Sequence, residues 1–159
     1  MTDAILISQS ILGQDLTAQD CELLSLAVTH RSLEKGEILF DEGSTDETLY
    51  ILISGKLEVL KMVGSDHSIS IDILKEGSMT GELSFIDGHP HTMRLIAKKD
   101  SNVLMLHKTA FENLVEKHPL VTYHVMRSIL RYSHMLQRKM NVKYLEMHRM
   151  VQNQYTAQY

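Results

Sequence analysis

Cysteine is nearly absent from this sequence. Cys21 is the one cysteine among 159 residues, which excludes a disulfide framework and favours a reducing compartment. No apolar run is long enough to span a bilayer, and the N-terminus lacks a basic stretch followed by an apolar one. We therefore expect a cytoplasmic protein that has no membrane partner.

Proline is also scarce, and neither proline nor glycine follows Pro119. A helix can therefore run from Leu120 to about Tyr155 without interruption. Its apolar residues recur at steps of three or four and so share one face. These residues are Ile129, Tyr132, Leu136, Met140, Tyr144, Met147 and Val151. Such a helix would reach about 50 Å, which is more than a domain of this size can cover. We expect a homodimer through this helix, and the alternative is a helix that folds back on its own domain.

The balance of charge is slightly acidic, with a formal net charge of −4. This value argues against nucleic acid as the main partner of the whole chain. Hydrophobic residues make up 43% and charged residues 23%, which is an ordinary globular composition. Basic residues crowd the end of the chain, where a solvated helix face explains them.

Between residues 27 and 107 the pattern consists of short apolar segments separated by glycine turns. Residues 69–73 alternate isoleucine with polar residues, which predicts a half-buried strand. We predict the α+β class, with an antiparallel β-roll of about eight strands that resembles a jelly roll. An N-terminal helix and the long C-terminal helix flank it. The predicted domains are 1–118 for the roll and 119–159 for the dimerisation helix.

Three shorter helices complete the prediction. The first has Thr17 as its N-cap, carries Asp20 in its first turn and ends near Val28. Another covers residues 109–117, with Thr109 as its cap. The third covers residues 81–88 inside the β region, where glycine stands at both ends. A helix inside an antiparallel roll is uncommon, so this one suggests a functional site.

Several motifs follow one another in the order of one known family. They include Lys35-Gly36-Glu37-Ile38, Ser54-Gly55-Lys56-Leu57-Glu58-Val59, Gly81-Glu82-Leu83-Ser84 and Pro90. Over about residues 15–140 the chain resembles the cyclic nucleotide-binding domains of the bacterial catabolite activator and the cAMP-dependent kinase regulatory subunits. The resemblance implies a non-enzymatic sensor module whose roll binds cAMP, cGMP or a related phosphate ligand. Binding would shift the last helix and so signal to a partner protein.

The resemblance also implies the ligand-binding residues. They are Gly81, Glu82, Leu83, Ser84, His91 and Thr92. A helix N-terminus offers unbonded backbone N–H groups to a phosphate, and Gly81 lets the backbone come close to it. In the family, the glutamate at position 82 binds a ribose hydroxyl. The alternative for Glu82 is a favourable acid in a first helical turn.

The chain departs from the family pattern at His91, because an arginine follows the proline in the family. Guanidinium is a permanently charged fork, whereas imidazole is a single donor whose charge varies near neutral pH. Losing the fork would weaken a cyclic phosphate by about 10- to 100-fold. His91 either contacts phosphate when protonated, with affinity rising below about pH 6.5, or marks a degenerate member that serves as a ligand-free scaffold. Arg94, three residues further on, is a possible substitute for that arginine, but strand alternation is expected to turn it to the opposite face from His91.

Other chemistries find no support in the sequence. His89 and His91 would need a third histidine or a carboxylate at suitable spacing to bind a metal, so no metal and no cofactor are predicted. Motifs of nucleophilic or phosphoryl-transfer enzymes are missing. In the catabolite-activator branch a helix-turn-helix domain follows the long helix. This chain ends at Tyr159, so we expect it not to bind DNA alone.

Overall fold

The structure, a computed structural model, describes residues 1–157. The chain forms two compact units, of which the first is Met1–Ser128 and the second begins at Ile129. The predicted boundary between residues 118 and 119 lies earlier in the chain and stays a prediction. The first unit contains the sheet and the candidate site.

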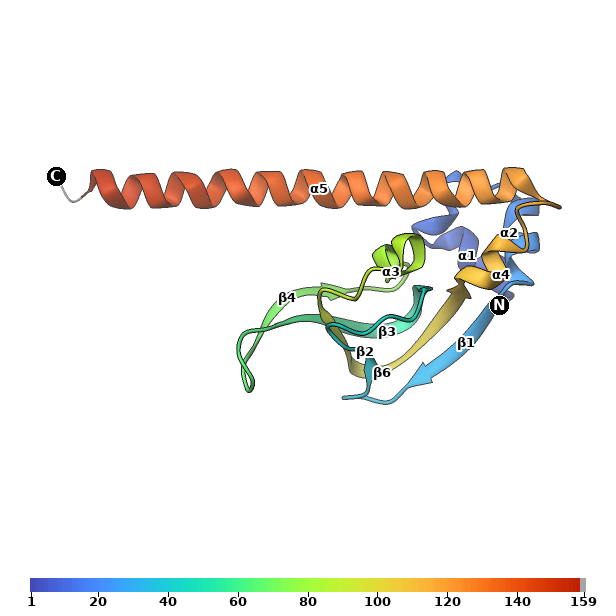
Figure 1. The fold of residues 1–159 in the computed structure, drawn as a ribbon, viewed down its shortest axis with the longest axis horizontal. Helices are drawn as coiled ribbons and strands as arrows, with labels where there is room; N and C mark the ends of the chain where they lie inside the picture. Colours follow the sequence, from blue (N-terminus) through green and yellow to red (C-terminus); the bar gives the residue numbers. More distant parts are fainter. Residues whose placement is uncertain (158–159) are drawn as a thin grey trace. The chain divides into compact units, whose positions relative to one another are not determined.

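The sheet is antiparallel throughout, which confirms the predicted fold class (Figure 1). Six strands are described: β1 (Val28–Leu33), β2 (Ile38–Phe40), β3 (Thr48–Met62), β4 (Ser68–Leu74), β5 (Met79–Thr80) and β6 (Arg94–His107). The strand order is β1-β6-β3-β4, while β2 pairs with β6 and β5 pairs with β3. β3 and β6 pair along most of their length, so Thr48 at the start of β3 lies opposite His107 at the end of β6.

The described strands are fewer than the eight or so predicted, because β3 and β6 are long. The sequence suggested separate strands on either side of Gly55, but β3 continues through this glycine. Gly55 has a φ of 103°, and a Cβ there would lie 2.1 Å from Ser101 Oγ. A residue with a side chain does not fit this position, so glycine permits the close pairing of β3 with β6. The pairing register shifts on both sides of this point.

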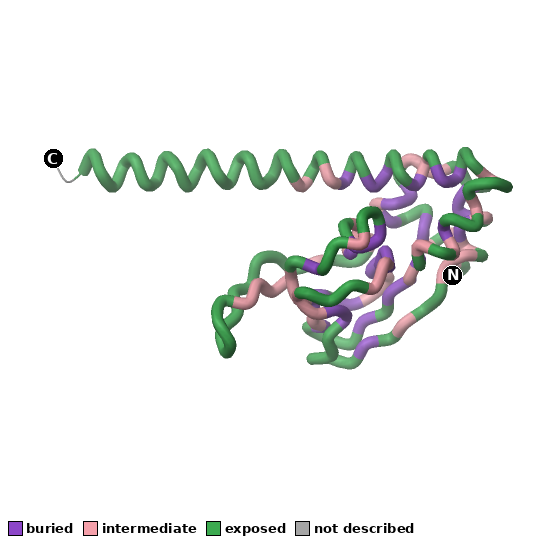
Figure 2. Tube along the Cα trace, viewed as in Figure 1, coloured by how far each residue is buried: buried purple, intermediate pink, exposed green. Residues whose placement is uncertain are grey.

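The core of the roll is aliphatic with two aromatic rings. Its buried members are Leu33, Leu39, Phe40, Tyr50, Leu52, Leu57, Leu95, Ala97 and Val103. They come from β1, β2, β3 and β6, so strands far apart in the sequence supply one core. Figure 2 shows the buried residues along these strands.

The prediction of a half-buried strand over residues 69–73 is only partly right. The strand exists as β4, but Ile69, Ile71 and Ile73 are 49%, 47% and 40% exposed. β4 lies at the edge of the sheet, so its outer edge has no neighbouring strand among the described residues. A register shift between Val59 and Leu60 also interrupts its pairing with β3. Since a bulge breaks the alternation of faces, the isoleucines do not line one buried side.

The N-terminal part consists of α1 (Asp3–Gln9), the 3₁₀ helix η1 (Leu12–Asp15) and α2 (Ala18–Ser25). The predicted cap is confirmed, because Thr17 Oγ1 accepts from the N–H of Asp20 at 3.1 Å. Asp20 Oδ2 accepts in return from the N–H of Thr17 at 2.8 Å, which completes a capping box. The helix ends before the predicted Val28, because that residue begins β1.

Two helices follow β6: α4 (Lys108–Glu112) and α5 (Pro119–Thr156). α4 is shorter than predicted, and its N-cap is His107 instead of Thr109. His107 Nδ1 accepts from the N–H of Thr109 at 3.3 Å. The long uninterrupted helix is confirmed as α5.

The apolar stripe of α5 changes in exposure along the helix. Ile129 and Tyr132 are buried, whereas Met140, Tyr144 and Met147 are 69%, 69% and 64% exposed. Within the described residues, no helix is long and apolar enough to cross a membrane.

Candidate functional site

The predicted helix inside the β region is present as α3 (Glu82–Asp87), which lies between two glycines. Gly81 is its N-cap and Gly88 its C-cap, with φ values of 83° and 66°. A Cβ at Gly81 would lie 2.6 Å from the carbonyl oxygen of Thr48. The helix start is therefore held against the start of β3, where a larger residue does not fit.

Ser84 is completely buried and joins α3 to the loop that precedes β3. Its Oγ accepts hydrogen bonds from the backbone N–H groups of Asp46 and Glu47, at 3.3 and 3.1 Å. Among the described residues, these two N–H groups have no other hydrogen-bond acceptor. In the structure, the Ser84 hydroxyl thus stabilises the loop.

Glu82 is half-buried at the first position of α3. Burial raises the pKa of its carboxyl group, although its own backbone N–H and the nearby His91 partly offset that rise. The carboxyl group therefore holds its proton to a higher pH than an exposed glutamate. A carboxyl group in this setting can accept or donate a hydrogen bond.

His91 lies inside the roll, with a side chain that is 4% exposed. Its Nε2 is 2.9 Å from Asp46 Oδ1. The imidazole ring stacks on Phe40 with a centroid separation of 3.7 Å and an interplanar angle of 14°. The backbone of His91 pairs with the loop before β3. Its carbonyl accepts from the N–H of Gly43 at 2.7 Å, and its N–H donates to the carbonyl of Ser44 at 2.8 Å.

Asp46 contacts Ser84, Tyr50 and His91, and the sequence did not single it out. Its Oδ2 accepts from the hydroxyl of Tyr50 at 2.5 Å, and its Oδ1 also accepts from the N–H of Thr48 at 3.3 Å. Burial and the hydrogen bond to Asp46 raise the pKa of Tyr50 well above its usual range. Asp46 and His91 are far apart in the sequence, so no local motif joins them.

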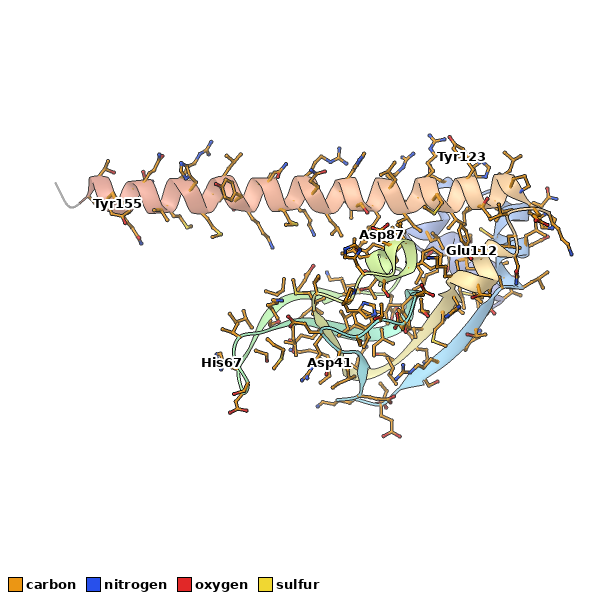
Figure 3. All side chains as sticks on the ribbon, in the orientation of Figure 1. Asp41, His67, Asp87, Glu112, Tyr123 and Tyr155 are labelled. Carbon is orange, nitrogen blue, oxygen red and sulfur yellow. The ribbon has the colours of Figure 1, made fainter. Side chains whose placement is uncertain are left out.

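Arg94, a possible substitute for the missing arginine, belongs to a different contact. Its Nε and Nη2 donate to the two carboxylate oxygens of Asp41 at 2.8 and 2.9 Å. The side-chain hydrogen bond holds the pKa of Asp41 below its usual range and raises the pKa of Arg94. Figure 3 shows Asp41 beside β2. This bidentate pair fixes the loop after β2 to the start of β6.

The predicted site residues thus fall into two groups. Ser84 and His91 both contact Asp46, and Glu82 lies within electrostatic range of His91. Leu83 is 49% exposed. Thr92 is also exposed, and its carbonyl accepts from Lys61 Nζ at 3.0 Å. The roles of all these residues as ligand contacts stay predictions. Within the part of the chain that the structure describes, no three acidic, histidine or cysteine side chains gather as a metal site.

Comparisons with known proteins agree with this architecture. The family model named Cyclic nucleotide-binding domain matches residues 30–118. The Anaerobic regulatory protein of Bacillus subtilis is 30% identical over 128 residues, which are 79% of this chain and 53% of that protein. The Cyclic AMP receptor protein of Thermus thermophilus is 23% identical over 77% of this chain and 56% of its own length. The chain thus spans about half the length of these relatives.

Solved structures show the same fold. A cyclic nucleotide-binding domain from Methylobacillus flagellatus superposes with a TM-score of 0.77 at 20% identity, covering 87% of this chain and 78% of that one. The Catabolite Activator Protein of Thermus thermophilus gives a TM-score of 0.70 at 21% identity, over 84% of this chain and 62% of that one. At this level of identity the likeness concerns the fold alone.

Proposed function

Because the chain belongs to the cyclic nucleotide-binding domain family, we propose that it is a non-enzymatic sensor that binds a cyclic nucleotide or related phosphate ligand. The observation that supports this most is the intact cassette from Gly81 to Ser84, which is built around α3 and closely backed by β3. Gly81 lets a ligand approach the backbone, and Glu82 offers a half-buried carboxyl group to a ribose hydroxyl.

A second candidate is a ligand-free scaffold, and one observation favours it. His91, at the position of the family's phosphate-binding arginine, is buried against Phe40 and bonded to Asp46. A side chain held in this way contributes to the packing of the roll without any ligand. In that case the helices and the closed roll would serve association with other proteins.

Calorimetry with cAMP and with cGMP on the purified chain separates the two candidates. A sensor releases or absorbs heat on binding, and Glu82→Gln weakens the affinity because it removes the acidic acceptor. The His91→Arg variant, which restores the forked cation, should bind about 10- to 100-fold more tightly than the wild type. If both the wild type and His91→Arg fail to bind either nucleotide, the cyclic-nucleotide sensor is contradicted and the scaffold is favoured.

We further propose that two copies associate through α5 and that ligand binding shifts this helix to signal to a partner protein. The support is the exposed apolar stripe of α5, including Met140, Tyr144 and Met147. In this organisation residues 1–118 hold the ligand and residues 119–159 form the dimerisation helix. A reducing compartment such as the cytoplasm suits the free, buried Cys21.

A further inference from the structure

We propose that the roll takes up its anionic ligand together with a proton, because Asp46 fixes the hydrogen of His91 on Nε2 and leaves only Nδ1 available to the ligand. This inference rests on the proposed function, in which the anion binds beside His91. It makes Asp46 a positioning residue that acts through His91. The ligand class is a phosphate-bearing anion.

The hydrogen bonds around Asp46 show which atoms carry hydrogens. Tyr50 keeps its phenolic hydrogen, and its hydroxyl donates to Asp46 Oδ2. The N–H of Thr48 donates to Oδ1. The carboxylate of Asp46 therefore acts as an acceptor on both oxygens. His91 Nε2, at 2.9 Å from Oδ1, must then be the donor of that contact.

This assignment determines what the other ring nitrogen can do. Neutral imidazole carries one hydrogen, so a hydrogen on Nε2 leaves Nδ1 as an acceptor. Within the described residues, Nδ1 of His91 makes no hydrogen bond. A cyclic phosphodiester has no P–OH group, so its oxygens only accept and cannot bond to Nδ1 of the neutral ring. Contact between the two requires a hydrogen on Nδ1 as well, which makes the ring an imidazolium ion.

The charged groups around His91 suit this coupling. Asp46 faces the ring from the loop before β3, and the Tyr50 hydroxyl on β3 donates to Asp46. Glu82 on α3 interacts electrostatically with His91. The cations nearby are paired, because Arg94 binds Asp41 and Lys61 binds Glu42. The proton that reaches Nδ1 comes from solvent and leaves with the ligand, so no bond other than N–H forms or breaks.

The first test needs no ligand. Long-range ¹⁵N–¹H NMR on the full chain at pH 8 should show a neutral His91 with its hydrogen on Nε2. In Asp46→Asn the side-chain amide can donate to Nε2, so the Nδ1–H form should become populated. Asp72→Asn, in which an exposed aspartate of β4 is changed, is the matched control and should leave the His91 signals in place. A wild-type ring with its hydrogen on Nδ1 contradicts the inference.

The second test measures protons directly. Calorimetry with cAMP and cGMP in buffers of different ionisation enthalpy gives the number of protons bound with each nucleotide, and inorganic phosphate serves only as a binding probe because it titrates itself near neutral pH. Wherever the ring of the free protein is neutral, the dissociation constant should rise about tenfold per pH unit, because binding then requires uptake of one proton. His91→Arg should bind without proton uptake. Asp46→Asn should take up fewer protons than Asp72→Asn, which should match the wild type.

The outcomes separate this inference from the proposed function. Ligand binding by the wild type without proton uptake overturns the role of His91 and Asp46 and leaves the ligand site standing. Binding by His91→Arg alone has the same meaning, because His91 then provides no anchor in either charge state. If the wild type and His91→Arg each bind none of the three probes, the proposed function and the inference are both overturned.

Discussion

At the scale of single residues, Ser84 illustrates how a side chain can belong to a ligand motif and yet bond elsewhere. The resemblance places Ser84 at the phosphate, whereas its Oγ accepts from the amides of Asp46 and Glu47. The loop that carries Asp46 therefore depends on α3. A ligand that moves α3 would therefore move Asp46, and through Asp46 it would move His91.

Replacement of Ser84 by alanine should lower the free energy of unfolding by about 1–3 kcal/mol, because it leaves two amides beside a buried position without an acceptor. Urea unfolding followed by circular dichroism measures this change. Ser44→Ala is the control, since Ser44 is exposed and its hydroxyl donates to the carbonyl of Asp41. An equal decrease in the free energy of unfolding in both variants would show that the buried Ser84 acceptor stabilises the protein no more than the exposed Ser44 hydroxyl does.

Gly81 permits both a positive φ and a close backbone contact, and the two effects can be measured separately. Gly64 has a φ of 81°, close to the 83° of Gly81, but a Cβ there meets nothing within 4 Å. Alanine at Gly64 should cost about 1–2 kcal/mol from φ alone. Alanine at Gly81 should cost clearly more, because its Cβ lies 2.6 Å from the Thr48 carbonyl. Denaturant unfolding compares them, and equal costs would contradict the close contact.

At the scale of elements, the capping box of α2 also holds the first turns of α5. Asp20 is buried, and its Oδ2 lies 2.7 Å from Nδ1 of His124 on α5. Arg127 and Ser128 contact Asp15 of η1 in the same way. The N-terminal segment and the start of α5 are thereby joined through two aspartates. This join lies within the first compact unit.

Asp20 should make stability depend on pH. Burial raises the pKa of Asp20, but hydrogen bonds from the backbone and side chain of Thr17 and from His124 outweigh it, so the pKa lies below its usual value. The stabilisation is therefore present above the unfolded pKa near 3.9 and is lost as the pH falls through the folded pKa. Asp20→Asn should cost about 1 kcal/mol at pH 7.

Urea unfolding between pH 7 and pH 2.5 measures this dependence. The difference between wild type and Asp20→Asn should shrink below about pH 4. Asp66→Asn, at an exposed position in the turn between β3 and β4, should show no such trend. A difference that stays constant over the whole range would mean that the carboxylate charge of Asp20 does not contribute.

At the scale of the whole molecule, the second half of α5 exposes an apolar stripe. Met140, Tyr144 and Met147 are each more than half exposed and lie at steps of three or four along the helix. A second copy of the same stripe would bury them. A two-fold interface places the same residues on both sides, as is common in homodimers.

A single charge in this stripe should abolish association. We expect the wild type to be a dimer by sedimentation and Met147→Glu to be a monomer at the same concentration, because two buried carboxylates would face each other. Val142→Glu is the matched control. Val142 is 55% exposed, and helical spacing places it on the opposite face. A monomeric wild type, or equal dissociation of both variants, would contradict the proposed seam.

Patterns among near neighbours were enough to predict the features that repeat or cap locally. The period of the apolar residues in α5, the Thr17 cap and the glycine-bounded α3 are set by contacts between near neighbours. The glycine-spaced motifs likewise predicted the family to which the chain belongs. Strand count and the burial of β4 were harder to predict, because glycine inside β3 looks like a turn and an edge strand has the same alternation as a covered one.

The chemistry around His91, in contrast, depends on contacts between distant segments of the chain. The sequence identified the histidine, but Asp46 and Phe40 reach it from separate parts of the chain, and Tyr50 in turn binds Asp46. The pairing of β2, β3 and β6 brings these segments together. Arg94 illustrates the same limit, since its partner Asp41 is set by the loop after β2. Local patterns fix hydrogen bonds between near neighbours, whereas the direction in which a histidine donates depends on the residue that folding places opposite it.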